Sequence, residues 1–296
     1  MKKIFISILV ILSLLTTAIL PAYASAMTYR DVSASHWAYD SIKAVTAAGL
    51  MHGKVKNEMF SKNDRVNIAE VFTTLYRLAE EEEIPEQFSN SVYFGSSDNA
   101  TADSNKWYSA PWKWAIYNGI AQDHSDRHSR QKHNSDKSFI SYVYPWELFK
   151  EATRADIVLA LYYYVNTYME QEISSSYDLS VFSDWRYDEA YPELVDPEKE
   201  TLDVFNDSFP RGRFTNAYSP SALDIINATE WAVSVGIIEG YPDGTIGIQD
   251  VKRYLDPIGF GENVDYVWHE RRDIKYVTRA EYAVILDRFM RYLKEI

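Results

Sequence analysis

The stretch Val277-Thr278-Arg279-Ala280-Glu281 decides the fold, because related stretches occur twice more in the 296-residue chain. One copy is Ala152-Thr153-Arg154-Ala155-Asp156, and a degenerate copy is Val66-Asn67-Ile68-Ala69-Glu70. Each copy runs into apolar residues spaced three or four positions apart, which is typical of an amphipathic helix. Each is also preceded by a tryptophan-containing segment that ends in glycine. A phrase that recurs together with its surroundings predicts a repeat architecture.

A further helix is expected ahead of each copy. In the first repeat, apolar residues at helical spacing lead from Trp37 to Gly49, and glycine is a common helix stop. Trp107 stands 12 residues before Gly119, as Trp37 does before Gly49, and a similar segment ends at Gly236. We therefore expect a mostly α fold of three tandem helix-loop-helix repeats.

The predicted boundaries follow from this alignment. They are a signal peptide at residues 1–26 and repeats at residues 27–84, 85–173 and 174–296. The second and third repeats carry long insertions, which we expect to be irregular or to form short strands. One of them runs roughly from Tyr187 to Thr215. Insertions into repeats map to surface loops.

The first 26 residues have the layout of a secretory signal peptide. Two lysines precede the apolar run Ile4–Leu15, and small residues at 22–26 offer cleavage sites. An uncleaved membrane anchor is the alternative. After cleavage, no stretch approaches the roughly 20 apolar residues that span a bilayer, so no stable membrane insertion is expected. The mature chain is then released, or held outside the cell by non-covalent binding.

Composition excludes two classes of protein. The formal net charge is −13, and nucleic acid is an unexpected partner because its binding is driven by clustered lysine and arginine. The chain has no cysteine, so an exported protein of this kind needs a core or a repeat array rather than disulfides.

The recurring phrase contains a capping box, in which an N-cap side chain and an acid three residues later satisfy each other's backbone N–H groups. The three predicted boxes are Thr278 with Glu281, Thr153 with Asp156, and Asn67 with Glu70. Caps alone are a sufficient explanation of these residues.

Arg154 and Arg279 need a different explanation, because a cation at the first helical position opposes the helix dipole. An exposed arginine beside free N–H groups would make an anion site, and its planar fork matches a carboxylate. A salt bridge to a neighbouring repeat is the alternative, and it suits a chain this acidic. The residues themselves leave both interpretations open.

The tryptophans also have two interpretations. Trp37, Trp107, Trp114 and Trp231 are predicted on helices at apolar spacing, and most are expected in the core. Trp107 and Trp112 flank a polar start that contains proline, so one of them is expected to be partly exposed. An exposed indole face would stack on a sugar ring.

The layout Tyr-x-Asp, His-Trp-Ala, helix, glycine, turn, phenylalanine and Thr-Arg-Ala-Glu resembles the S-layer homology domain. Its most specific stretches are 236–245 and Val277–Glu281, and the resemblance covers the whole mature chain. It implies three repeats around a pseudo-threefold axis, with grooves that bind pyruvylated secondary cell-wall polysaccharide of Gram-positive-type envelopes. The motif arginine would bind the ketal carboxylate. The predicted ligand-binding residues are Arg154, Arg279, Thr153, Thr278, Trp37 and Trp107.

The chain departs from the family pattern at Ile68, which stands where the first repeat should have its arginine. Arg65 lies three residues earlier and is the only nearby substitute. One or two competent grooves are therefore expected. Other envelope or S-layer proteins are further candidate partners, and no cofactor, metal or catalytic residue is predicted.

Two alternatives stay open. A secreted enzyme that processes wall glycans would need paired carboxylates, which the 43 acidic residues supply by chance, but no recognisable catalytic phrase surrounds any of them. A metal-dependent surface interaction protein is the second alternative. It would use the cluster Asp123, His124, Asp126, His128 and His133, which is better explained as a polar exposed loop.

Overall fold

The computed structural model describes residues 29–54, 58–89, 92–94, 105–121, 141–143, 148–174, 176–185, 222–248, 253–258, 265–270 and 276–296. Three features predicted above lie outside these residues. They are the signal peptide, the Tyr187–Thr215 insertion and the cluster of histidines and aspartates at 123–133.

The described part of the chain is mostly helical, as predicted. Its longer helices are α2 (Tyr39–Ala47), α3 (Ile68–Leu78), α5 (Ser109–Tyr117), α7 (Arg154–Tyr163), α10 (Ala222–Ser234) and α11 (Arg279–Tyr292). We call α2 and α3 pair 1, α5 and α7 pair 2, and α10 and α11 pair 3. Three short helices are α4 (Glu86–Ser89), the π-helical turn η2 (Tyr164–Tyr168) and the 3-10 turn η3 (Leu179–Val181).

Among the described residues, short strands occur within the predicted second and third repeats. Strand β2 (Ser141–Val143) pairs in parallel with β1 (Val92–Phe94). Strands β3 (Arg253–Ile258) and β4 (Asp265–Glu270) form an antiparallel hairpin whose register joins Arg253 to Glu270.

The second helix of each pair begins at a capping box. Asn67, Thr153 and Thr278 are the N-caps of α3, α7 and α11, and each exchanges hydrogen bonds with the acid three residues later. Such boxes satisfy backbone N–H groups that the first helical turn leaves free. The three predicted boxes are confirmed.

The first helix of each pair ends at a glycine. Gly49, Gly119 and Gly236 have φ of +72°, +70° and +73°, a left-handed conformation that suits glycine. The next residue then donates its N–H back to the helix, as Ile237 does to the carbonyl of Ala232 at 2.8 Å. The predicted helix stops are confirmed.

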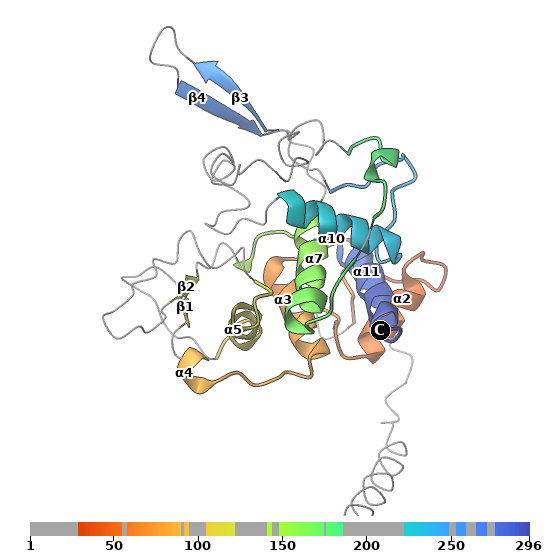
Figure 1. Ribbon diagram of the computed structural model, residues 1–296. Helices are drawn as coiled ribbons and strands as arrows, with labels where there is room; N and C mark the ends of the chain where they lie inside the picture. The colour runs from red at the N-terminus through yellow and green to blue at the C-terminus, as the bar shows by residue number, and fades with distance from the viewer. Residues whose placement is uncertain are drawn as a thin grey trace, which may run out of the picture.

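The helices pack in a repeating order (Figure 1). Helix α5 packs on α3, α10 packs on α7, and α2 packs on α11. Each first helix thus covers the second helix of the preceding pair, and pair 3 takes the place before pair 1. Helices α3 and α7 also contact each other.

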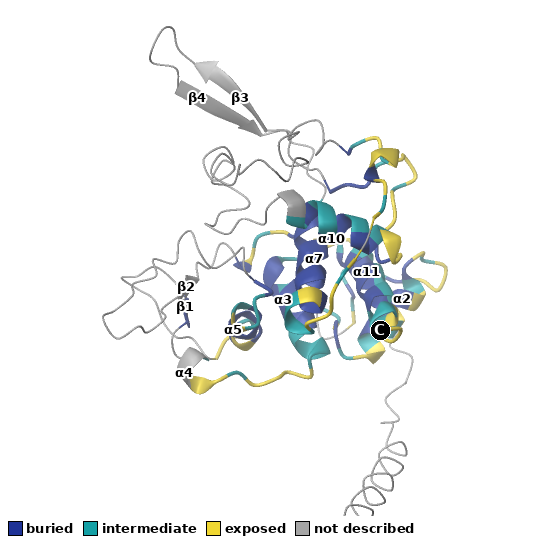
Figure 2. Cartoon of the chain, viewed as in Figure 1, coloured by how far each residue is buried: buried dark blue, intermediate teal, exposed yellow. Residues whose placement is uncertain are grey.

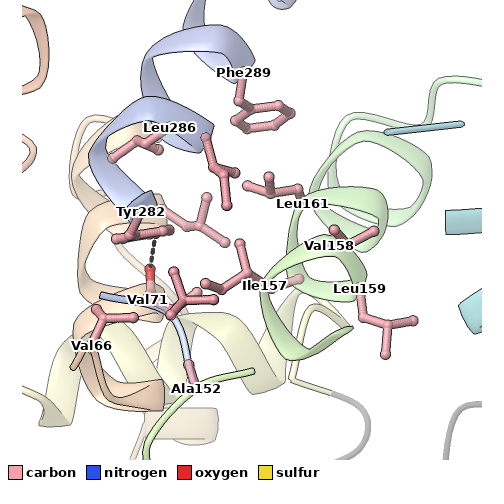
Figure 3. Close-up of a cluster of buried hydrophobic side chains, with 14 of the residues drawn as sticks. Val66, Val71, Ala152, Ile157, Val158, Leu159, Leu161, Tyr282, Leu286 and Phe289 are labelled. Carbon is pink, nitrogen blue, oxygen red and sulfur yellow. Dashed lines mark hydrogen bonds between the residues drawn. The ribbon is translucent and has the colours of Figure 1, made fainter. Parts of the chain in front are cut away.

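The second helices form the centre of the core. Figure 2 shows α3, α7 and α11 largely buried, with the exposed segments at the periphery. Figure 3 shows Tyr282, Leu286 and Phe289 of α11 facing Ile157 and Leu161 of α7. All five are at most 1% exposed. The apolar faces predicted for these helices are therefore confirmed as core.

Three backbone segments that precede the second helices bind one another in a closed cycle. The N–H of Val66 donates to the carbonyl of Val277 at 3.0 Å, and the N–H of Val277 donates to Ala152 at 2.9 Å. The N–H of Ala152 donates to Val66 at 2.8 Å and completes the cycle. Each helix pair is therefore bound to both others next to its capping box. Across the described residues, no helix has the length and apolar character needed to cross a membrane.

Candidate functional site

Arg279 lies at the start of α11 and reaches into pair 1. Its Nε donates to the carbonyl of Phe60 at 2.9 Å, and Nη2 donates to the carbonyl of His52 at 2.7 Å. Its Nη1 donates to Glu70 Oε1 at 2.8 Å, which makes an ion pair. All three nitrogens are engaged, and the residue is 4% exposed. The guanidinium therefore joins pair 3 to pair 1.

Arg154 lies at the equivalent place at the start of α7 and reaches into pair 3. Its Nη1 donates to the carbonyls of Glu239 and Ile246, both at 2.8 Å. Its guanidinium carbon lies 4.0 Å from the centre of the Tyr241 ring. The residue is 8% exposed, and its buried Nε has no hydrogen-bond partner in the described part of the chain. Among the described residues, no carboxylate forms an ion pair with this arginine.

One interpretation of the sequence required both arginines to be exposed at the helix starts. The structure corrects this expectation, because both side chains are buried. Both are buried because the loop that follows the first helix of the next pair covers each helix start. For Arg279 the alternative interpretation, a salt bridge to a neighbouring repeat, is the one observed. Arg154 is buried in the same way but has no carboxylate partner among the described residues, and a buried charge without a counterion is costly.

Thr153 and Thr278 are engaged in their caps. The hydroxyl of Thr278 donates to Glu281 Oε2 at 2.8 Å, and the hydroxyl of Thr153 donates to Asp156 Oδ2 at 2.8 Å. Each hydroxyl also accepts the backbone N–H of the same acid. Because both hydroxyls already donate within the caps, neither threonine has a free donor to support its predicted contribution to ligand binding.

The tryptophans divide into two groups. Trp112, Trp114 and Trp231 are buried, as expected of core residues, whereas Trp37 is 66% exposed and Trp107 is 53% exposed. The exposed two precede α2 and α5 rather than lie on them, which corrects the predicted helical placement. They stand in the turns that lead into these helices, where the side chain is not directed at the core.

The two exposed tryptophans have different neighbours. Trp37 stacks on His36, with ring centres 5.5 Å apart. Trp107 lies 6.3 Å from Phe149, and both contact Tyr108. Among the described residues, neither tryptophan contacts Arg154 or Arg279. The structure therefore does not gather the predicted ligand-binding residues into one site.

Arg65 does not replace the missing arginine of the first repeat. Its Nη1 donates to Glu151 Oε2 at 2.6 Å, and its guanidinium lies over the Tyr276 ring. The side chain is about half exposed. It forms a surface pair between segments, while Ile68 stays in the core.

Sequence reasoning missed Asp184, which binds the loop between α10 and α11 of pair 3. Asp184 accepts the N–H groups of Ile246 and Gly247, at 2.7 and 2.8 Å. Asp31 does the same in pair 1, where it accepts the N–H groups of Phe60 and Lys62. The signal was available, because Phe182-Ser183-Asp184-Trp185 parallels Tyr29-Arg30-Asp31-Val32.

These carboxylates hold the loops that supply the arginine-binding carbonyls. Phe60 and Ile246 each donate their N–H to the aspartate and accept an arginine hydrogen bond with their carbonyl. The two contacts are therefore built alike. They share an aspartate, a loop carbonyl and an arginine from the preceding helix pair.

Comparison with known families identifies part of this construction. Residues 28–61 match the S-layer homology domain. The match covers α2, its glycine stop and the loop that ends near Phe60, which is the loop that receives Arg279. No curated protein matches the chain.

An S-layer homology domain is a module that anchors proteins at the cell wall or cell surface. The match therefore supports a role in cell-wall binding and an association with the cell surface. It assigns one such domain and does not extend to the other two helix pairs. Among the described residues, no group of histidine and acidic side chains is placed to hold a metal ion.

Proposed function

We propose that the chain is a non-catalytic module that binds an anionic, pyruvylated cell-wall polysaccharide at Arg154. The observation that carries the proposal is the state of this guanidinium. It is held by two carbonyls and an aromatic ring, and it has no carboxylate partner among the described residues. A planar guanidinium with donors to spare matches a carboxylate.

The proposal includes three S-layer homology units related by a pseudo-threefold axis. Three features support it: the three capping boxes, the three glycine stops and the closed cycle of backbone bonds. The proposed place of action is the outside of a Gram-positive-type envelope, with wall glycan and other envelope proteins as partners and no role for nucleic acid. The matched S-layer homology domain supports that location.

The proposal separates the two motif arginines. Arg154 is the ligand-binding residue, because no carboxylate of the described residues compensates its charge. Arg279 has every nitrogen occupied by pair 1, so its role is to join pair 3 to pair 1. Ile68 supplies no charge to the third contact.

Co-sedimentation with purified walls tests the proposal. We expect Arg154→Gln to weaken binding by about tenfold or more, because a charge-assisted hydrogen bond is lost. Arg30→Gln is the matched control, since it removes the same charge from an exposed side chain. Walls stripped of their polysaccharide should bind neither protein.

Two outcomes would overturn the proposal. One is a folded Arg154→Gln variant that sediments as the wild type does. The other is release of sugar or peptide from the walls by the purified protein, which would favour the glycan-processing enzyme.

A further inference from the structure

The two arginine contacts differ at one position of the receiving loop. Tyr241 stands five residues after Gly236, and Lys54 stands five residues after Gly49. The guanidinium carbon of Arg154 lies over the Tyr241 ring, 4.0 Å from its centre. Lys54 instead pairs with acids of its own unit, with Nζ 3.2 Å from Asp64 and 3.8 Å from Glu70.

The two contacts also differ in the donor that the second carboxylate oxygen of the capping acid accepts. In pair 1, Glu70 Oε2 accepts the cap N–H of Asn67, and Oε1 accepts Arg279. In pair 3, Glu281 Oε2 serves the cap in the same way. Its Oε1 accepts the hydroxyl of Tyr241 at 3.2 Å instead of an arginine.

Gly247 lies next to both the Tyr241 ring and the Arg154 side chain. A Cβ at this position would lie 2.7 Å from Tyr241 Cε2 and 3.7 Å from Arg154 Cδ. The position corresponding to Gly247 in pair 1, directly after Phe60, is Ser61. Absence of a side chain at Gly247 therefore makes room for the ring beside the arginine.

We infer that Tyr241 is a positioning residue that keeps Glu281 away from Arg154 and so leaves the guanidinium available to a glycan carboxylate. The inference rests on the proposed function and adds the reason why one contact binds ligand while the other does not. Where lysine replaces the tyrosine, the acid closes on the arginine and the contact becomes structural. Where tyrosine is present, the acid is occupied by its hydroxyl.

A rescue experiment tests the inference. Tyr241→Leu removes both the hydroxyl and the ring but keeps an apolar side chain, so Glu281 is free to pair with Arg154. We expect wall binding in the co-sedimentation assay to fall by about tenfold. Adding Glu281→Gln should restore it to within about twofold, because glutamine keeps the capping box but cannot neutralise the arginine. Glu281→Gln alone should bind at least as tightly as the wild type.

A second readout does not depend on the wall. The Nε–H resonance of Arg154 should move in Tyr241→Phe, when the ion pair forms, and should return when Glu281→Gln is added, because both variants keep the aromatic ring beside the guanidinium. Tyr241→Phe keeps the ring and loses the hydroxyl, and it gives the same test with the least disturbance of the fold. It should bind more weakly than the wild type and should also be rescued by Glu281→Gln.

The outcomes separate the two ideas. If Arg154→Gln binds walls as the wild type does, the proposed function fails. If Arg154→Gln loses binding but both Tyr241 variants bind normally, or if Glu281→Gln fails to rescue them, the role of Tyr241 is overturned and the proposed function stands. Failure of rescue in Tyr241→Leu together with rescue in Tyr241→Phe would mean that the ring itself contacts the sugar.

Discussion

At the residue scale, we expect loss of the Arg279 side chain to lower the free energy of unfolding most. It is 4% exposed and holds Glu70 and two loop carbonyls, so Arg279→Met leaves three acceptors without their donor. We expect the free energy of unfolding to fall by about 3 kcal/mol, as for other broken buried pairs. Urea denaturation measures it.

The control for this prediction is Arg30→Met. Arg30 pairs with Glu58 on the surface, and its side chain is 75% exposed, so the expected cost is below about 0.5 kcal/mol. Equal costs at the two positions would mean that the buried contact is not a joint between pairs 1 and 3.

Asp31 gives a prediction with a pH dependence. Burial alone would raise the pKa of Asp31, but the N–H groups of Lys62 and Phe60 donate to it and bring the pKa below 3.8. The unfolded chain therefore binds the proton more readily, and the stabilisation present above pH 3.8 is lost as the pH falls through the lower folded-state value. Asp31→Asn should cost about 1–3 kcal/mol at neutral pH.

Urea denaturation at a series of pH values checks this prediction. The difference in stability between the wild type and Asp31→Asn should shrink in acid, where the wild-type carboxyl is protonated too. A difference that stays constant down to acid pH would show that the carboxylate charge is not what matters.

Residue-scale prediction from the sequence succeeded where the partner is local. Thr278 and Glu281 are three residues apart, so their cap depends only on the helix start itself. The partners of Arg279 are more than 200 residues away along the chain. Spacing within the phrase carries no information on them, which is why exposure and burial stayed equally open for the arginines.

At the element scale, Gly236 tests why the first helices stop where they do. Its φ is +73°, and a Cβ added there would meet nothing within 4 Å. The cost of a substitution is therefore conformational, about 1–2 kcal/mol for a residue such as valine. Gly236→Asn should cost less, because asparagine tolerates the left-handed region.

Thermal or urea unfolding of the two variants gives the comparison. Equal losses for Gly236→Val and Gly236→Asn would mean that the backbone conformation is not what limits substitution here. Gly49 has the same φ and the same open surroundings, so the same ranking is expected there.

Periodicity predicted the second helices well because their buried faces are long and continuous. It was less informative at Trp37 and Trp107, where an apolar residue precedes the helix and stays on the surface. An apolar residue next to a periodic run looks like part of it in sequence, although the first helical turn has not yet begun.

At the scale of the whole molecule, Tyr282 tests whether the helix pairs unfold together. The side chain is fully buried, and its hydroxyl bonds to Thr74 and to the carbonyl of Val71, 3.5 Å away (Figure 3). Tyr282→Phe removes these bonds between pairs 3 and 1, at a cost of about 1 kcal/mol.

Hydrogen exchange of individual amides shows which helices lose stability in Tyr282→Phe. If the described helices form one cooperative body, amides of α7 in pair 2 should lose as much protection as those of α2 in pair 1. Loss confined to α2 and α11 would show that pair 2 unfolds independently.

The capping boxes and glycine stops of the helix pairs were visible in the sequence, but the closed cycle between the pairs was not. Nothing in the phrase Val66–Glu70 indicates that this segment binds both 152 and 277. Hydrogen bonds between short backbone segments depend on how the pairs are arranged in space, and the side chains that sequence reasoning uses do not specify them.

The closed cycle of Val66, Ala152 and Val277 also limits how such a protein can change in size. In an open stack of repeats, the outermost unit has one neighbour, so units can be gained or lost and the ends need special sequences to cover them. In the cycle each described helix pair has two neighbours. Deleting or inserting one unit would leave two broken junctions instead of a shorter or longer stack, so evolution is expected to act on its loops and not on its number of units.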